Sequence, residues 1–169
     1  MSGLAIIWHS RTGAAKAMAA AALEGAGPES GAGSGAGAQA RLIAAAEAEP
    51  DALLGASGYL FVCPENLGSM TGAMKEMFDR CYYPLLGQIE GRPYATAIAA
   101  GSDGRGAQAQ IDRIVTGWRL RRVAQPLIVN LDAQTPQAIL AAKQPAPAHL
   151  QQCRELGGAL AEGLRMGIF

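Results

Sequence analysis

Residues 9–15, HSRTGAA, form the first segment whose residue types could do chemistry. They follow a short apolar run and lead into an alanine-rich stretch, so we expect them to join a strand to a helix. The free N–H groups at a helix N-terminus bind anions, and the hydroxyls of Ser10 and Thr12 add donors. With Gly13 as its only glycine, the segment lacks both the GxGxxG dinucleotide motif and the GKS/GKT of a nucleotide P-loop. It predicts a cradle for one phosphate monoester; a simple capped helix start is the alternative.

A second candidate segment is residues 64–70, PENLGSM, directly after the apolar run at 58–63. Its proline and its Asn-Leu-Gly sequence indicate an ordered turn with exposed backbone amides. Such a turn can offer N–H and C=O groups to the edge of a planar heterocycle while Leu67 and Met70 contact the ring face. A purely structural turn explains this segment equally well.

The third candidate segment, residues 101–106, reads GSDGRG. Its three glycines allow the backbone to approach a ligand closely. Asp103 precedes a helical pattern, so we expect its carboxylate to cap that helix.

Other reactive side chains have ordinary structural explanations. His9 is expected to stabilise the loop in which it lies. Cys63 precedes a proline, but no arginine follows six residues later as a phosphatase loop requires, so a buried strand end is expected. The three cysteines form no CxxC or Cys/His pattern, which disfavours a metal site and a disulfide scaffold. The sequence therefore identifies no catalytic residue and no metal ligand.

The elements that must position these segments alternate between strand and helix. Strands are expected at 4–8, 40–46, 58–63, 94–100 and 123–130, and helices at 14–23, 71–82, 107–118 and 150–164, with a helical turn at 51–56. A methionine stripe on the second helix indicates core packing, and Pro126 places the last strand at a sheet edge. This alternation predicts an α/β fold with a parallel sheet and helices on both faces. Ligands bind such sheets beyond the carboxyl ends of the strands, where the three candidate segments lie.

Composition limits the class of protein. The 169 residues suit a single domain over 1–169, and the Gly/Ala-rich stretch 25–38 is expected to be a flexible loop. Basic and acidic residues number 14 each, so no charge field favours nucleic acid. We expect no membrane partner, because no uncharged apolar run approaches about 18 residues. The N-terminus lacks the basic region of a signal peptide, and the cysteine usage favours a cytoplasmic location.

Two of the candidate segments also carry a family resemblance. The run IIWHSRTG resembles the first strand and phosphate loop of flavodoxin-like proteins, and PENLGSM followed by MKEMFDR is similar to their second flavin loop and helix. Within that superfamily the chain most resembles the NAD(P)H-dependent FMN reductase and quinone reductase branch. The resemblance implies a flavodoxin-like three-layer α/β sandwich whose five parallel strands have the order 2-1-3-4-5.

The resemblance further implies non-covalently bound FMN and assigns residues to its two ends. Around the phosphate it places Ser10, Arg11, Thr12, Gly13, Ala14 and Ala15; around the isoalloxazine ring it places Pro64, Glu65, Asn66, Leu67, Gly68, Ser69, Met70, Gly101, Ser102, Asp103 and Gly104. The implied reaction is hydride transfer from NAD(P)H through FMN to a small acceptor such as a quinone.

Two departures from the family pattern keep alternative functions open. Ala14 and Ala15 stand where related proteins often carry hydroxyl or amide side chains, and neither ring segment holds an aromatic residue. One alternative is a flavodoxin-type electron carrier, which the zero net charge disfavours because such carriers usually dock through acidic surfaces. The other is a binding or regulatory domain in which flavin binding is weak or lost.

Two further segments have candidate roles. Residues 82–86, YYPLL, are expected to form either a lid beside the flavin or part of a homodimer contact. Residues 118–122, WRLRR, read as a solvated helix end, with assistance to a nucleotide phosphate as the less favoured alternative.

Overall fold

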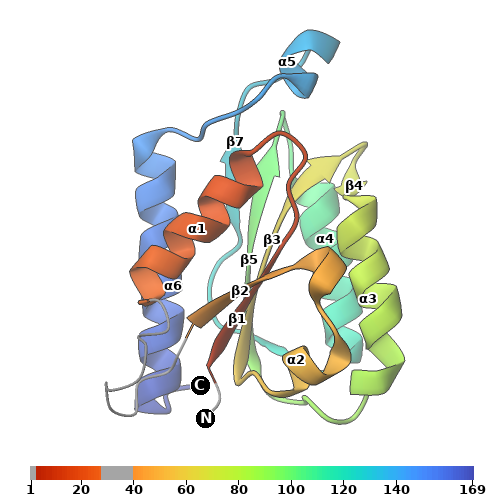
Figure 1. The fold of residues 1–169 in the computed structure, drawn as a ribbon, viewed down its shortest axis with the longest axis vertical. Coiled ribbons are helices and arrows are strands. Elements are labelled where there is room, and N and C mark those ends of the chain that lie inside the picture. Colours follow the sequence, from red (N-terminus) through yellow and green to blue (C-terminus); the bar gives the residue numbers. More distant parts are fainter. Residues whose placement is uncertain (1–2, 28–39) are drawn as a thin grey trace.

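The computed structural model describes residues 3–27 and 40–169, which build a parallel sheet between two layers of helices (Figure 1). Strand β1 (Leu4–Trp8) lies between β2 (Ala40–Ala44) and β3 (Gly58–Asn66). Beyond β3 follow β5 (Pro93–Ala100) and then β7 (Leu127–Asn130), and all these pairings are parallel. The predicted order 2-1-3-4-5 is confirmed for these five strands. Most of the loop expected at 25–38 lies outside the described residues.

Two short strands were not predicted. β4 (Ser69–Met70) pairs with β3 in antiparallel orientation, and β6 (Arg121–Arg122) pairs with the beginning of β5. The single strand expected at 123–130 is wrong in its first half, because the chain leaves the sheet between β6 and β7. Pro126 falls in that gap instead of inside the edge strand, since its ring nitrogen has no hydrogen to donate to a ladder.

Helices cover both faces of the sheet (Figure 1). On one face lie α1 (Ala14–Ala26) and α6 (Pro147–Met166), and on the other lie α2 (Pro50–Leu54), α3 (Gly72–Leu85) and α4 (Arg105–Gly117). A single 3-10 turn (Ala45–Glu47) follows β2. A short helix that was not expected, α5 (Pro136–Leu140), stands above the carboxyl ends of the strands. Among the described helices none is long and apolar enough to cross a membrane.

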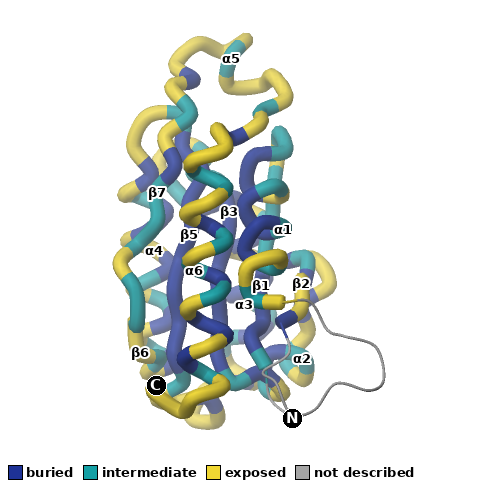
Figure 2. The backbone as a smooth tube through the Cα atoms, turned by 90° about the vertical axis from the view of Figure 1, so that its left-hand side faces the viewer, coloured by how far each residue is buried: buried dark blue, intermediate teal, exposed yellow. Residues whose placement is uncertain are grey.

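The sheet separates two hydrophobic cores, and its strands are the most deeply buried part of the backbone (Figure 2). The core on the α3 and α4 side contains Phe61 from the sheet, Phe78 from α3, Trp118 at the end of α4, and the methionine stripe of α3, whose core role is confirmed. The core on the α1 and α6 side is filled mainly by alanines, which explains much of the alanine content. The sheet is thereby packed on both faces beneath the segments at its carboxyl edge.

Candidate functional site

A cleft of about 380 Å³ lies at the carboxyl ends of β1, β3 and β5. The three candidate segments meet there, and ten of their residues line its wall: His9, Ser10, Arg11, Thr12, Ala14, Ala15, Pro64, Glu65, Asn66 and Gly101. The volume lies within the range of sites for small molecules and cofactors. The fold therefore brings together segments whose first residues, 9, 64 and 101, are far apart in the sequence, as the topology predicts.

The turn between β1 and α1 is shaped as an anion cradle. Gly13 adopts a φ of +105°, and its N–H donates to Ser10 Oγ at 3.1 Å, which leaves the Ser10 hydroxyl proton free to donate. The first bond of the helical ladder runs from Ala17 N–H to the Gly13 carbonyl at 3.0 Å. The N–H groups of the three residues between them have no acceptor within the helix. Backbone donors thus remain although Ala14 and Ala15 have no polar side chain.

The second candidate segment contains the ordered turn that the sequence predicted, and the strand pairing that makes it a β-hairpin was not predicted. Strand β3 continues through Asn66, and β4 returns beside it, pairing Asn66 with Ser69. At the turn Leu67 and Gly68 both have positive φ, 54° and 73°, the pattern of a type I′ hairpin. Leu67 is 95 % exposed and Met70 is buried in the core.

Eight predicted site residues lie outside the wall of the cleft: Gly13, Leu67, Gly68, Ser69, Met70, Ser102, Asp103 and Gly104. Gly13 belongs to the cradle through its backbone, and the others lie in the hairpin or in the turn before α4. Their contact with a ligand stays a prediction.

Glu65 caps helix α4 from outside that helix. Its Oε1 accepts the Gly104 N–H at 2.9 Å and its Oε2 accepts the Ala107 N–H at 3.0 Å. The cap expected from Asp103 is found only in part: its Oδ1 accepts the backbone N–H of Arg105, the first residue of α4, at 3.3 Å, and the same oxygen pairs with the Arg105 side chain, Oδ1 to Nε 2.6 Å. The Arg105 guanidinium lowers the pKa of Asp103. Because Glu65 also lines the cleft, a negative charge held by a helix N-terminus faces the ligand space.

His9 connects two walls of the cleft. The backbone N–H of His9 donates to the Val62 carbonyl at 3.0 Å. Its ring nitrogen Nδ1 shares a 2.9 Å hydrogen bond with the buried hydroxyl of Thr71, at the start of α3. Burial, assisted by the nearby Arg11, lowers the pKa of His9. Both effects favour the neutral imidazole, and the bond to Thr71 confirms the expected loop-stabilising role.

Cys63 lies below the cleft and is fully buried. Burial raises the pKa of its thiol to about 12. The thiolate is therefore not formed near neutral pH, and the expected buried strand end is confirmed.

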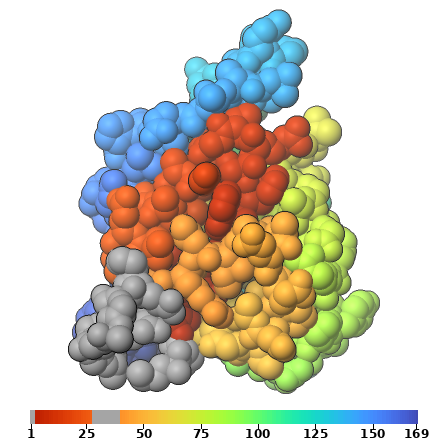
Figure 3. Space-filling view, in the orientation of Figure 1, coloured from red at the N-terminus to blue at the C-terminus, as the bar shows by residue number. Residues whose placement is uncertain are grey.

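A fourth wall of the cleft was missed by sequence reasoning. Residues 131–143, here called the strap, include α5 and contribute Leu131, Ala133, Ile139, Leu140 and Lys143 to the lining. Figure 3 shows the strap standing above the red phosphate segment. The one local signal was Thr135 before Pro136, a helix-start pattern: Thr135 Oγ1 accepts the Ala138 N–H at 3.2 Å.

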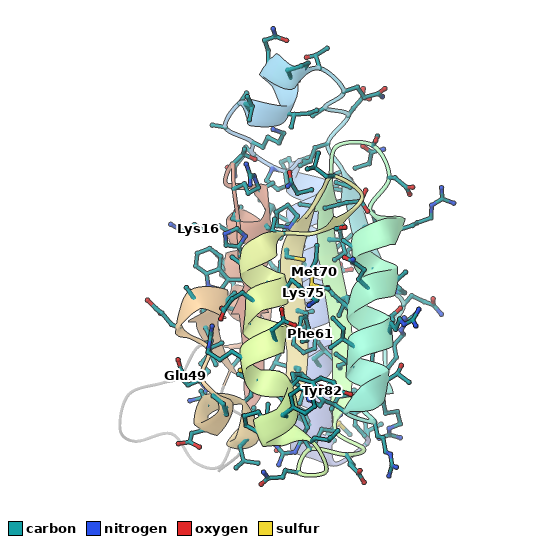
Figure 4. All side chains as sticks on the ribbon, turned by 90° about the vertical axis from the view of Figure 1, so that its right-hand side faces the viewer. Lys16, Glu49, Phe61, Met70, Lys75 and Tyr82 are labelled. Atoms are coloured by element: carbon teal, nitrogen blue, oxygen red, sulfur yellow. The ribbon has the colours of Figure 1, made fainter. Side chains whose placement is uncertain are left out.

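Two segments with candidate roles lie at the other end of the molecule. Tyr82 is at the lower end of α3, far from the hairpin that holds Met70 (Figure 4). A lid role for residues 82–86 is therefore wrong. Arg121 and Arg122 pair with Pro93 and Tyr94, where β5 begins, so assistance to a phosphate at the cleft is wrong as well.

Comparison with known proteins gives one family match. The family model described as NADPH-dependent FMN reductase matches residues 44–136, more than half of the chain. No curated protein matches.

Solved structures share the fold at low sequence identity. A flavodoxin from the domain Archaea is 20 % identical, with 96 % of this chain and 99 % of that chain covered and a TM-score of 0.74. A flavodoxin, WrbA-like protein from Agrobacterium tumefaciens is 17 % identical, with 98 % and 99 % covered and a TM-score of 0.74. The rubredoxin oxygen:oxidoreductase of Desulfovibrio gigas is 12 % identical, with 99 % of this chain and 37 % of that chain covered and a TM-score of 0.72. The fold is thus flavodoxin-like.

Proposed function

The chain belongs to the NADPH-dependent FMN reductase family, a family of FMN-binding oxidoreductases with the flavodoxin-like fold, and from this we propose that it is an NAD(P)H-dependent reductase that passes hydride through bound FMN to a quinone. FMN binds without a covalent bond, and the nicotinamide nucleotide is the co-substrate.

The observation that carries the proposal is the continuity of the cleft from the anion cradle to the ring segments. FMN has a phosphate monoester at one end and a planar ring at the other. The cradle at the start of α1 offers the free backbone donors and the Ser10 and Thr12 hydroxyls that a phosphate needs. The opposite part of the cleft is bounded by Pro64, Asn66 and Gly101. The donor chemistry and the size of the cleft both fit FMN.

When bound, FMN supplies the ring that accepts and releases hydride, so the protein has to bind and orient it. Arg11 adds a cation at the phosphate end of the cleft. The His9 bond to Thr71 fixes the phosphate segment against α3, and Glu65 fixes the hairpin against α4. These contacts hold the walls in one arrangement, and none of these residues is assigned a proton-transfer role.

The residues that line the cleft, all within the described part of the chain, include no Phe, Tyr or Trp. No Phe, Tyr or Trp side chain from the wall therefore stacks on a ring bound there. A ring face without such a stacked side chain suits a reductase, since the nicotinamide and then the acceptor must stack on it for hydride transfer. A carrier that exchanges single electrons with proteins has no such requirement.

The proposal is tested by an FMN titration followed by an assay. We expect saturable binding of one FMN per chain, oxidation of NADPH or NADH by the reconstituted protein, and two-electron reduction of a soluble benzoquinone. Binding combined with only one-electron exchange with a redox protein would favour the flavodoxin-type carrier. Absence of saturable FMN binding at high micromolar concentration would contradict both functions.

A further inference from the structure

We propose that the strap is a fourth flavin-binding segment, in which Lys143 meets the phosphate and Ile139 and Leu140 cover the apolar part of the ligand. The inference rests on FMN binding in the cleft, as proposed above. It assigns ligand contacts to a segment that lies outside the three loops expected from the sequence.

The two ends of the strap are anchored where the two ends of FMN are expected. At its beginning, the Ala133 N–H donates to the Gly101 carbonyl at 2.9 Å, beside the ring segments. At its end, the Lys143 N–H donates to the Thr12 carbonyl at 2.8 Å, in the phosphate segment. The strap therefore spans the cleft in the direction in which FMN would lie.

Close backbone packing shows that both anchors are built into the fold. A Cβ on Gly101 would lie 2.6 Å from the Ala133 carbonyl oxygen, closer than any side chain allows. A Cβ on Gly13 would lie 3.3 Å from the Lys143 carbonyl oxygen. Since Gly13 also has a positive φ, the cradle and the end of the strap are fitted to each other.

Lys143 is one of the residues that line the cleft, and its side chain carries a cation. Its ammonium donates to the carbonyls of Ile139 at 2.6 Å and Ala141 at 2.9 Å, and an ammonium has a third proton to donate. Neither Lys143 nor Arg11 forms an ion pair with a carboxylate within residues 3–27 and 40–169. A phosphate with a charge of about −1.5 to −2 is a stronger acceptor than a neutral carbonyl, so it attracts this ammonium.

Lys143 also compensates for the side-chain donors that Ala14 and Ala15 do not provide to a phosphate in the cradle. These two side chains line the phosphate end of the cleft and offer no donor. An ammonium delivered from the strap supplies the missing donor together with a full charge.

The apolar part of the strap is exposed although it faces a cleft. Ile139 is 46 % exposed and Leu140 is 70 % exposed, and α5 has no buried residue. A bound flavin would remove part of this apolar surface from water. Because the ring segments contain no aromatic residue, the exposed Ile139 and Leu140 are large apolar residues available for this contact, beside the less exposed Leu131.

The test compares FMN with riboflavin, which has the same ring and lacks the phosphate. Dissociation constants are measured by quenching of flavin fluorescence for the wild type and for Lys143→Met. We expect the variant to bind FMN about ten- to a hundredfold more weakly, the effect of losing a hydrogen bond to a charged group. Its affinity for riboflavin should change less than about twofold. Lys143→Arg, which keeps the charge and the donors, should restore most of the affinity for FMN.

Lys75→Met is the matched control, because Lys75 lies on α3 and pairs with Asp79 at 2.6 Å, away from the cleft wall (Figure 4). It should leave both dissociation constants unchanged. The double change Ile139→Ser/Leu140→Ser should weaken FMN and riboflavin by the same factor, about tenfold. Thermal unfolding of each variant confirms that the fold is kept.

Three results would overturn the inference. If Lys143→Met weakens both flavins equally, the lysine acts only through the conformation of the strap. If it changes neither, the lysine does not contact the phosphate. If the wild type binds FMN and the double serine variant binds it equally well, the strap is not a flavin wall. A wild type that binds neither flavin contradicts the proposed function itself, and the inference with it.

Discussion

At the scale of single residues, the cleft is organised by polar side chains that hold the backbone in place. Glu65 receives two N–H groups of α4, and His9 bonds to Thr71, so each joins segments that are distant in sequence. The sequence identified both as residues near the cleft. It did not reveal these partners, because a long-range hydrogen bond leaves no local pattern.

The Glu65 cap leads to a stability prediction. Glu65→Gln keeps one acceptor oxygen but turns an NH₂ group toward a backbone N–H of α4, and it removes the charge that favours a helix N-terminus. We expect the free energy of unfolding to fall by about 1 to 3 kcal/mol, measured by urea denaturation. Asp103→Asn is the control and should have little effect, because Asp103 forms an exposed pair. Equal effects of the two changes would disprove the capping role.

The environment of His9 leads to a pH prediction. Burial and Arg11 lower its pKa below the ordinary value of 6.5, so near that value the unfolded chain binds more protons than the folded one. The contribution of His9 to stability is therefore present above pH 6.5, the ordinary pKa that applies in the unfolded chain. It is lost as the pH falls from 6.5 through the lower pKa of the folded protein. An NMR titration of the imidazole should give a midpoint below 6.5, and His9→Gln should flatten the pH dependence of unfolding. A midpoint at or above 6.5 would refute the assigned environment.

At the scale of elements, apolar patterning predicted the long strands and helices, and it failed where long-range contacts decide the structure. β1, β3 and β5 are built on largely apolar runs, and their placement was confirmed, with β3 extending to Asn66 beyond its expected end. The hairpin was missed because its turn puts Leu67 at a positive φ, which leucine rarely adopts. The strap was missed because α5 has five residues and no buried face, and the strap is held at its ends by backbone hydrogen bonds.

The contact between α1 and α6 gives the element-scale prediction. A Cβ on Gly157 would lie 2.0 Å from the Ala22 carbonyl oxygen, so the two helices can approach only because this position is glycine. Gly157→Ala should lower the free energy of unfolding by about 1 to 3 kcal/mol despite the better helix propensity of alanine. Gly72→Ala on α3, where a Cβ meets nothing within 4 Å, is the control. A Gly157→Ala protein as stable as its control would refute this close packing.

At the scale of the whole molecule, a sheet packed on both faces carries a cleft at one end, and the opposite end is not involved in it. Tyr83 and Leu86 are exposed at that opposite end, 79 % and 48 %, so the homodimer contact expected for residues 82–86 stays a prediction. The formal net charge of zero gives the molecule no overall acidic field that would attract a basic redox partner. The cleft at one end and the zero net charge both agree with the proposed reductase, whose substrates are small molecules that enter the cleft.

The measurement that tests this account most directly is the absorbance of the FMN-reconstituted protein after anaerobic mixing with NADPH. The account predicts saturable FMN binding, then loss of the oxidised flavin absorbance at a rate that rises with NADPH concentration. Addition of a benzoquinone should restore that absorbance, with one quinone reduced for each flavin. A protein that binds no FMN, or whose bound FMN stays oxidised in excess NADPH and NADH, would contradict the account.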